Sequence, residues 1–371
     1  MWHTILLSAL ILTISGLFYL GWSLSRMETL RKVLPMSRTL RLLSCLGILV
    51  LAGALGAALM GMMNTVICFL HLLIIWLLTE AVFLLIRLAC HRPLRKDAVG
   101  LTALFLTVLI LSKGWYNAHH VSLTRYDITT TKDLGKDSLS IVAFSDSHLG
   151  ATFHSEEFSR YIQEINLLRP DVVVIVGDYV DDSSSMEDLV SCSKALGDLK
   201  ARYGVYYVYG NHDRRYYSAG DGYTQEDLVR CLEDSGVRIL KDEVIPLTEN
   251  TYLIGRDNAS RGSFSRLSAQ DLMRQVPQGA YSIVLDHQPN DYRTEAASHM
   301  DLVLSGHTHG GQFWPLGHIG VLMGANDFCY GHKRINATDF IVSSGIGDWE
   351  LDFKTGCISE YVLVKVHKKA N

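Results

Sequence analysis

The sequence predicts two structural classes in one chain: a membrane-spanning helical region, followed by an α/β domain. Long apolar stretches fill the first third of the 371 residues, whereas from residue 139 onward short Val, Ile, Leu and Tyr runs alternate with amphipathic helical stretches. Such alternation is typical of α/β folds, in which helices cover a sheet. We therefore expect a transmembrane region at 1–115, a membrane-proximal linker with a first strand at 116–138, and a globular domain at 139–371.

Four apolar stretches are long enough to cross a bilayer, which takes about 20 residues of helix. They lie approximately at 4–22, 42–62, 65–86 and 98–115. The first lacks the basic leader and clear cleavage site of a signal peptide, and three more spans follow it. Water-soluble domains rarely contain several such runs, so we predict four membrane helices instead of a buried helical core.

Basic residues are distributed unevenly among the connections between these helices. The connections after the first and third spans contain all nine Lys and Arg of residues 1–112, whereas the N-terminus and the "MNT" link contain none. Cytoplasmic loops keep the positive charge, so both ends of the bundle are predicted to face outward. We expect a multi-pass protein of the cell membrane whose globular domain is extracytoplasmic.

Charge also limits the partners of the globular part. Residues 1–112 carry a net charge of +6 and residues 113–371 a net charge of −10. This acidic balance argues against a nucleic-acid partner, because phosphate neutralisation needs clustered Lys and Arg. The seven cysteines form no CxxC pair and no zinc-knuckle spacing, so we assign them no role.

Glu80 is a polar group at membrane depth, where an unpaired charge is expensive. Two interpretations remain open. Glu80 has a function in the membrane, or it lies near the inner interface and pairs with a basic residue such as Arg87.

The globular part contains candidate helices at about 155–168, 186–201, 224–235 and 268–275. Candidate strands lie at about 139–144, 171–176, 204–209, 236–240, 251–254, 281–285, 301–304, 339–343 and 358–365. By itself this pattern favours a single doubly wound sheet.

Five of the apolar runs end in residue types that bind metals. Loops beyond the strand ends of α/β sheets converge on one crevice, so these side chains can be neighbours in space. The runs are "LSIVAFSDSH" with Asp146 and His148, "DVVVIVGD" with Asp178, "VYYVYGNHD" with Asn211, His212 and Asp213, "YSIVLDH" with His287, and "DLVLSGHTH" with His307 and His309.

The "GHTHGG" segment places two imidazoles between glycines. Extended residues i and i+2 project to the same side, so we expect His307 and His309 to face one crevice while Thr308 turns away. The same reasoning applies to "DSH". The flanking glycines 306, 310 and 311 remove side-chain bulk and permit positive φ. Two ions about 3.5–4 Å apart would need ligands arranged in this way.

The ligand types are carboxylate, amide oxygen and imidazole without thiolate. They suit Mn²⁺, Fe or Zn²⁺ and do not decide among these metals. Asp178 is our candidate bridging carboxylate, because each of its oxygens can reach a different ion. Each motif alone has a plainer explanation: "GD" as a turn, "DSH" as a helix cap, His287 as a core histidine. The conjunction of all five predicts a site for two divalent ions.

In this order, "DSH", "GD", "GNHD", the His of "DHQP" and "GHTH" resemble the blocks of the calcineurin-like metallophosphoesterase family, over about residues 139–365. The extended forms "GDYVDD" and "GHTHGGQ" look most like its bacterial membrane-associated branch, whose members are proposed to act on cell-surface phosphoesters, including phospholipids. The resemblance implies two facing mixed sheets flanked by helices, an α+β variant that we adopt over the single sheet.

The resemblance also implies roles for individual residues. His212 would protonate the leaving group and Asp213 would orient it. The late segment "FKTGCISEY" departs from the branch, which often has an Arg and a Cys-Pro-Pro-Glu-like sequence there; only the Cys and Glu remain. One metal would be held by Asp146, His148, Asp178 and His309, and the other by Asp178, Asn211, His287 and His307.

These inferences predict a membrane-anchored phosphoesterase, a phosphatase or phosphodiesterase, that acts at the outer membrane surface on phospholipids or lipid carriers. A pair of divalent ions can lower the pKa of a shared water enough to supply hydroxide near neutral pH. Two alternatives remain: a cytoplasmic lipid-sugar pyrophosphatase, which the basic loops oppose, and a non-catalytic four-span sensor or transporter with a metal-binding outer domain, which the complete ligand set opposes.

Overall fold

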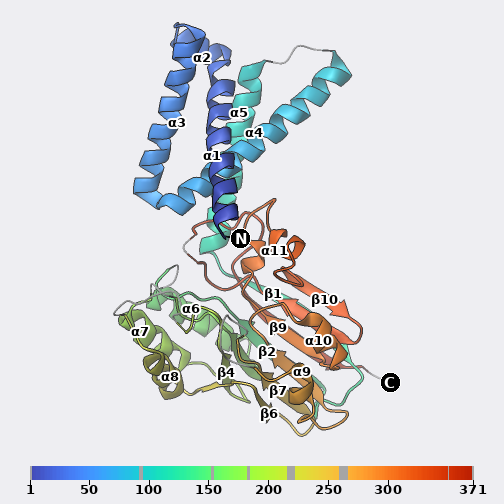
Figure 1. Ribbon diagram of the computed structural model, residues 1–371. Coiled ribbons are helices and arrows are strands. Elements are labelled where there is room, and N and C mark those ends of the chain that lie inside the picture. Colours follow the sequence, from blue (N-terminus) through green and yellow to red (C-terminus); the bar gives the residue numbers. More distant parts are fainter. Residues whose placement is uncertain are drawn as a thin grey trace. The chain divides into compact units, whose positions relative to one another are not determined.

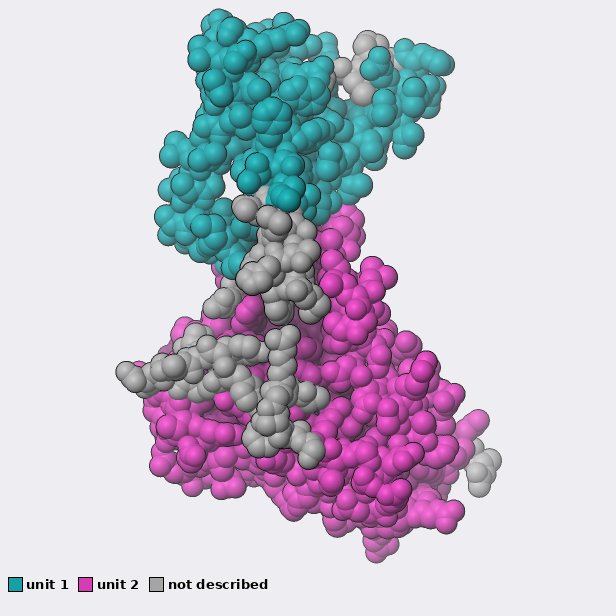
Figure 2. Space-filling model, in the orientation of Figure 1, with its two compact units in different colours: residues 1–114 teal, residues 115–371 magenta. Residues whose placement is uncertain are grey.

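The computed structural model describes residues 2–91, 95–151, 154–181, 184–214, 222–258, 266–349 and 351–369 (Figure 1). The chain forms two compact units, residues 1–114 and residues 115–371 (Figure 2). The first unit is helical and the second contains both sheets.

The first unit is built from α1 (Trp2–Ser25), α2 (Glu28–Val33), α3 (Arg38–Met60), α4 (Met62–Cys90) and most of α5 (Lys96–His119). Three segments are long and apolar enough to cross a membrane: Arg38–Met60, Met62–Cys90 and Asp97–His119. The apolar segment recognised in α1, Ile11–Ser25, is shorter than a span. Three of the four predicted spans are therefore confirmed as candidates, and the first stays a prediction.

Glu80 lies in a polar cluster within the helical unit. Its carboxylate accepts hydrogen bonds from the Tyr19 hydroxyl, from Ser23 Oγ at 3.0 Å and from Trp76 Nε1 at 3.3 Å. Trp76 itself is buried together with Leu20. No ion pair joins Glu80 to a basic side chain in the described part of the chain, so the pairing with Arg87 is not observed.

The second unit contains two six-stranded sheets, and both are mixed. In the first sheet β2 to β5 run parallel, and β12 lies antiparallel to β2 and parallel to β1. In the second sheet β7, β8, β9 and β11 run parallel, with antiparallel β6 and β10 at the edges. The first sheet has the order β1 (Ser122–Thr130), β12 (Glu360–Lys368), β2 (Ser138–Phe144), β3 (Val172–Val176), β4 (Val205–Val208), β5 (Val237–Ile239); the second has β10 (Gly331–Ile335), β11 (Thr338–Val342), β9 (Leu302–Ser305), β8 (Tyr281–Leu285), β7 (Thr251–Gly255), β6 (Glu243–Pro246).

The two sheets face each other across a shared core. Ile141 and Val174 of the first sheet belong to the same buried cluster as Leu253 and Ile283 of the second. Helices cover the outer faces (Figure 1): α6 (Ser155–Leu167), α7 (Met186–Leu196) and α8 (Gln225–Asp234) on the first sheet, and α9 (Ala269–Met273) and α10 (Tyr292–Ala297) on the second. Central strands are thus buried on both faces, which explains their continuous apolar runs. The expected two-sheet architecture is confirmed, and the single sheet favoured by the pattern alone is wrong.

The elements that sequence reasoning missed are short and lie at the periphery. The edge strands β6 and β10 and the helix α10 have only four to six residues. The sequence of β10, "GHKRI", is mostly exposed and polar, so no apolar run marks it. Helix α5 also continues to His119, into the stretch expected to be a linker.

Candidate metal centre

The five metal-ligand loops come from both sheets. The residues of "DSH", "GD" and "GNHD" follow β2, β3 and β4 of the first sheet, whereas His287 follows β8 and His307 follows β9 of the second. Three groups of potential ligands each have atoms that all lie within 4.8 Å of one another. Two of them join the two sheets: the first is Asp146, His148 and His309, and the second is Asp178, His287 and His307. The third, His148, Asp181 and His212, shares His148 with the first and comes from loops of the first sheet alone.

The group of Asp146, His148 and His309 adjoins the group of Asp178, His287 and His307. His148 Nε2 lies 3.2 Å from His309 Nε2 within the first group, and 3.9 Å from Asp178 Oδ2 of the second. Asp146, His148, Asp178 and His287 are almost completely buried. Potential ligand atoms of six side chains therefore lie close together beyond the carboxyl ends of the strands.

The backbone at these positions is unusual. Five residues have positive φ in the left-handed region, where non-glycine residues are uncommon. Such strain persists only where the surrounding structure enforces it, and it gathers at functional sites. The five are Asp146 (φ 53°), His148 (41°), Asp178 (50°), His307 (70°) and His309 (47°).

These dihedrals correct our expectation that "GHTH" and "DSH" are extended. β9 ends at Ser305, and a short 3₁₀ turn at His309–Gly311 follows it. As a result His307 and His309 point into different groups. Thr308 does turn away, as expected, because its Oγ1 donates a hydrogen bond to the Cys329 carbonyl at 2.5 Å.

Glycines allow the loops to approach one another closely. A Cβ on Gly306 would collide with Asp146 Oδ2 and the Ser145 side chain. A Cβ on Gly177 would lie 2.5 Å from His287 Nδ1. Gly310 and Gly311 have positive φ of 61° and 73°. Both expected functions of the "GHTHGG" glycines, removal of bulk and positive φ, are thus observed.

A hydrogen bond fixes the tautomer of His287. His287 Nδ1 lies 2.7 Å from the Val176 carbonyl oxygen, which can only accept, so Nδ1 carries the proton. In the neutral ring Nε2 then presents its lone pair to Asp178 Oδ2, 3.1 Å away. Two electron-rich atoms face each other only at a cost unless a proton or a metal ion lies between them. The arrangement fits a metal site, since metal-bound histidines usually donate their other N–H in this way.

The electrostatics of the site also favour a cation. Burial opposes a charge on His287, but the charge of Asp178 and their mutual hydrogen bond outweigh it and raise the pKa of His287 to about 10. Burial lowers the pKa of His307 to about 4, and the neighbouring His287 contributes to this lowering. The carboxylates of the site therefore attract positive charge, and His307 is kept neutral as a ligand must be.

Asp181 is a site residue that our sequence reasoning missed. Its Oδ2 accepts a hydrogen bond from His148 Nδ1 at 2.9 Å, and its Oδ1 lies 3.4 Å from His212 Nδ1. Burial opposes the charge of His212, but the contact with Asp181 and the charge of Asp178 raise the pKa of His212 to about 9. The signal was present in "GDYVDD", where Asp181 follows Asp178 by three residues in the same loop.

Asp213 and Asn211 belong to none of these ligand groups in the described part of the chain. The Asp213 carboxylate accepts hydrogen bonds from the backbone amides of Asp178 and Tyr179, both at 2.8 Å, and of Gly210 at 2.6 Å. It therefore holds the loops after β3 and β4 together, and its orienting role toward His212 stays a prediction. Asn211 is nearly buried, and its Oδ1 accepts a 3.4 Å hydrogen bond from Gln288 Nε2.

The divergent segment "FKTGCISEY" forms hydrogen bonds to the His309 loop and to residues 344–347. Lys354 is fully buried, and its Nζ donates to the carbonyls of Ser344 and Gly347 at 2.9 Å. Cys357 Sγ donates to the His309 carbonyl at 3.1 Å, and burial raises the pKa of this thiol to about 12. Cys357, to which the sequence assigned no role, therefore supports the backbone at His309. All seven cysteines are free.

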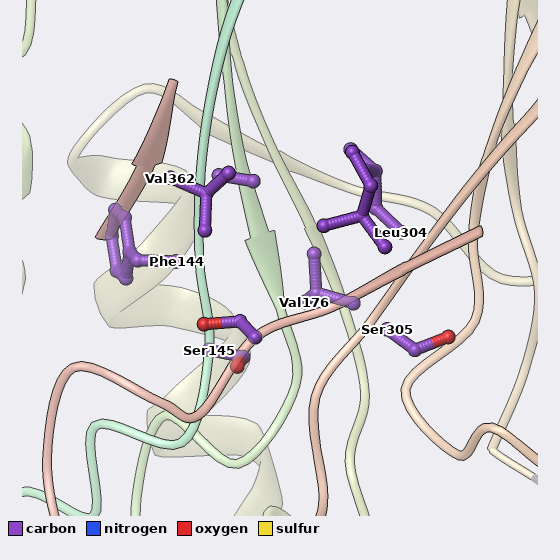
Figure 3. Close-up of a pocket in the computed structure, with 9 residues that line it drawn as sticks. Phe144, Ser145, Val176, Leu304, Ser305 and Val362 are labelled. Atoms are coloured by element: carbon purple, nitrogen blue, oxygen red, sulfur yellow. The ribbon is translucent and has the colours of Figure 1, made fainter. Parts of the chain in front are cut away.

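A cavity beneath the ligand loops is too small to be the reaction site (Figure 3). It measures about 10 Å³ and lies between the sheets, among strand-end residues that include Phe144, Val176, Leu304 and Val362. This is at the lower limit for a single water molecule. The candidate metal site lies instead in the loops that follow the strand ends.

Similarity to known proteins agrees with this geometry. The model of the calcineurin-like phosphoesterase family matches residues 139–311. An uncharacterized metallophosphoesterase of Campylobacter jejuni is 32% identical over 277 residues, which cover 72% of this chain and 70% of that protein. The chain therefore belongs to the calcineurin-like phosphoesterase family, and its class is that of a metal-dependent phosphoric ester hydrolase.

Two further proteins are similar to part of the chain. A zebrafish transmembrane protein with metallophosphoesterase domain is 33% identical over 236 residues, which cover 60% of this chain but only 52% of that protein. A dimetal phosphatase structure, also from zebrafish, matches 56% of this chain and 87% of its own at 11% identity and a TM-score of 0.38, too low to support a conclusion. The name of the first relative combines a transmembrane protein with a metallophosphoesterase domain.

Proposed function

We propose that this protein is a membrane-anchored, dinuclear-metal phosphoesterase that hydrolyses phosphoester bonds of phospholipids or lipid carriers at the outer membrane surface. The observation that carries the proposal is the pair of adjoining ligand groups, with Asp178 of one group 3.9 Å from His148 of the other. A carboxylate at this border can reach an ion on either side.

Within this proposal Asp178 is the bridging ligand. The ions are Mn²⁺, Fe or Zn²⁺, since the donors are nitrogen and oxygen without thiolate. When bound, such ions polarise a phosphoryl oxygen and lower the pKa of a nearby water. One ion is assigned to Asp146, His148, Asp178 and His309, and the other to Asp178, Asn211, His287 and His307.

His212 is the proposed general acid. It lies at the edge of the site, with its side chain 16% exposed, and Asp181 is beside its Nδ1. Holding Nδ1 in this way leaves Nε2 as the atom from which a proton can pass to the departing alkoxide. General acids of this kind contribute about 10²- to 10⁴-fold to the rate.

The proposed substrate class and location follow from the anchor. A domain tethered to a membrane meets lipid head groups at high effective concentration, which favours lipid phosphoesters over soluble ones. The connections between the helices are basic, which favours a cytoplasmic location for these connections. The domain then lies on the extracytoplasmic side. Protease added to intact cells should therefore cleave the domain; protection until the cells are opened would contradict this orientation.

The central experiment uses the full chain in nanodiscs. We expect about two metal ions per chain by elemental analysis and turnover of phosphomonoesters or phosphodiesters. Metal binding without any turnover would support the sensor or transporter alternative, and turnover restricted to a lipid-linked pyrophosphate would support the pyrophosphatase.

The variant His212→Ala separates binding from catalysis. We expect it to keep its metals and to lose about 10²- to 10⁴-fold in kcat on alkyl phosphoesters, with a smaller loss on p-nitrophenyl esters, whose leaving group needs no proton. Unchanged turnover of an alkyl phosphoester would contradict the assignment.

A further inference from the structure

The segment "FWPLGHIGVLM" at residues 313–323 has an unusually exposed apolar surface. Five of its large apolar side chains are exposed, from 44% for Trp314 to 83% for Leu322, whereas Phe313 and Val321 are partly buried. It contains no Asp, Glu, Lys or Arg. In the described part of residues 115–371, five of the eleven exposed large hydrophobic residues lie in this one segment: Trp314, Leu316, Ile319, Leu322 and Met323.

Single exposed hydrophobic residues are ordinary, but a contiguous group marks a surface that meets an apolar partner. Ile319, Leu322 and Met323 are three and four positions apart on or beside the short helix α11 (Ile319–Leu322), so they share one side of it. The segment also begins two residues after the 3₁₀ turn that contains His309. The apolar surface is thus an immediate extension of a metal-ligand loop.

The backbone of this segment is fixed. The Trp314 amide donates to Thr355 Oγ1 at 3.1 Å, and the Gly356 amide donates to the Gln312 carbonyl at 3.0 Å. Cys329 Sγ donates to the Gly317 carbonyl at 3.1 Å. The exposed side chains are therefore held outward by a defined structure, with residues 354–357 as one of its supports.

The same support holds the end of a membrane helix. Asn117 Nδ2, in the last turn of α5, donates to the carbonyls of Lys354 and Cys357, both at 3.0 Å. The preceding Trp115 and Tyr116 are about half exposed. Trp and Tyr concentrate at membrane–water interfaces, so they mark where the span Asp97–His119 leaves the bilayer. Residues 354–357 therefore form hydrogen bonds both to the end of α5, next to Trp115 and Tyr116, and to the segment with the exposed apolar surface.

We infer that residues 313–323 form a membrane-docking surface that enters the interfacial region of the bilayer beside the end of α5. The partner is a lipid surface, because the segment lacks charge, carries an interfacial Trp and is held to the exit point of a span. Docking would bring the His309 loop to the level of the lipid head groups. This catalytic consequence rests on the proposed function; the docking itself does not.

A fluorescent probe tests the docking directly. The full chain, with exposed Cys90 replaced by Ser, receives Leu322→Cys and an environment-sensitive label in nanodiscs made with or without dibrominated phosphatidylcholine. We expect a blue-shifted emission that brominated acyl chains quench. Leu167→Cys on α6 is the matched control, since Leu167 is 81% exposed, and its label should stay unquenched. The same chain without an introduced cysteine gives the background.

The inference is overturned if the label at position 322 is unquenched, whether its emission resembles that of the control or is blue-shifted by contact with protein. Activity supplies the second measurement. Leu322→Glu combined with Met323→Glu should lower turnover of a phosphoester lipid in bilayers by about tenfold or more, because buried apolar area is lost. Turnover of a soluble ester should not change, and Leu167→Glu should change neither.

The two proposals fail in different ways. A wild-type chain that binds metal but hydrolyses no ester would remove the proposed function, while quenching at position 322 would still establish docking. A wild-type chain that hydrolyses esters but shows no quenching would remove the docking surface alone. Equal loss of soluble and lipid turnover in the double variant would show damage to the site and would count against docking.

Discussion

Lys354 is a buried charge that fixes the backbone of residues 344–347. Its ammonium group is fully buried and bonded to backbone carbonyls of residues 344–347, just before Asp348. Burial raises the pKa of Asp348 to about 7, although the charge of Lys354 acts against this. Asp348 Oδ1 accepts from Gln312 at 2.7 Å and lies 3.8 Å from His309 Nδ1. The lysine therefore holds the loop whose Asp348 lies beside His309, a candidate metal ligand.

Replacing this residue tests that role. Lys354→Met removes a donor from three carbonyls, each of which costs about 1–3 kcal/mol when buried without a partner. We expect the free energy of unfolding to fall by about 3 kcal/mol, measured by denaturant or thermal unfolding of the full chain in detergent. Lys365→Met, on the exposed side of β12, should change it little. Equal stabilities of the two variants would show that the lysine is not structural.

Asp181 allows a second prediction at the residue scale. Asp181→Asn keeps an acceptor near His148 and His212 but removes the negative charge that favours a protonated His212. We expect kcat on alkyl phosphoesters to fall by about 10²-fold with metal content unchanged. Steady-state kinetics and elemental analysis measure the two effects. The control is Asp188→Asn, since Asp188 pairs with the exposed His154; a loss of similar size in the control would refute a specific role.

At the scale of elements, the turn after β9 depends on the absence of a side chain. Gly306→Ala would force its methyl group against Asp146 and Ser145. We expect a loss of bound metal and of activity while the overall circular dichroism is preserved. Gly320→Ala is the control, because its Cβ would meet only the Asn326 side chain at 3.1 Å. A Gly306→Ala protein with a full complement of metal would contradict the close packing described above.

The same scale explains which elements the sequence predicts well. Strands such as β3, "VVVIV", are buried on both faces and appear as continuous apolar runs. The edge strands β6 and β10 face solvent and lack that pattern, so only pairing with β7 and β11 defines them. The backbone of "GHTH" was wrongly expected to be extended, because periodicity cannot report a left-handed turn imposed by contacts from other loops.

At the scale of the whole molecule, the metal centre joins the two sheets. Two of the candidate ligand groups take residues from loops of both. Bound ions should therefore act as cross-links, and removing them with a chelator should lower the thermal unfolding temperature of the domain as well as abolish activity. At a free metal concentration of 100 times Kd, binding stabilises the folded state by about 2.7 kcal/mol.

Differential scanning of the full chain, before and after chelation and after metal is restored, measures this effect. The helical unit provides an internal reference, since the ligand groups lie outside residues 1–114. Chelation that leaves the unfolding of the domain unchanged would contradict a structural contribution from the ions.

The sequence by itself determined the order of a helical membrane region and an α/β domain, and it pointed to the side chains that gather at the strand ends. It could do so because apolar runs and the residues that end them are local properties of the chain. The apolar pattern alone favoured one sheet, and the two mixed sheets were implied by the family resemblance. Only the tertiary structure decided that His307 and His309 join different groups, and that Asp181 and Lys354 support them. These facts depend on side-chain contacts between different loops, such as that of His148 with His309, which are 161 residues apart, and no local pattern encodes such contacts.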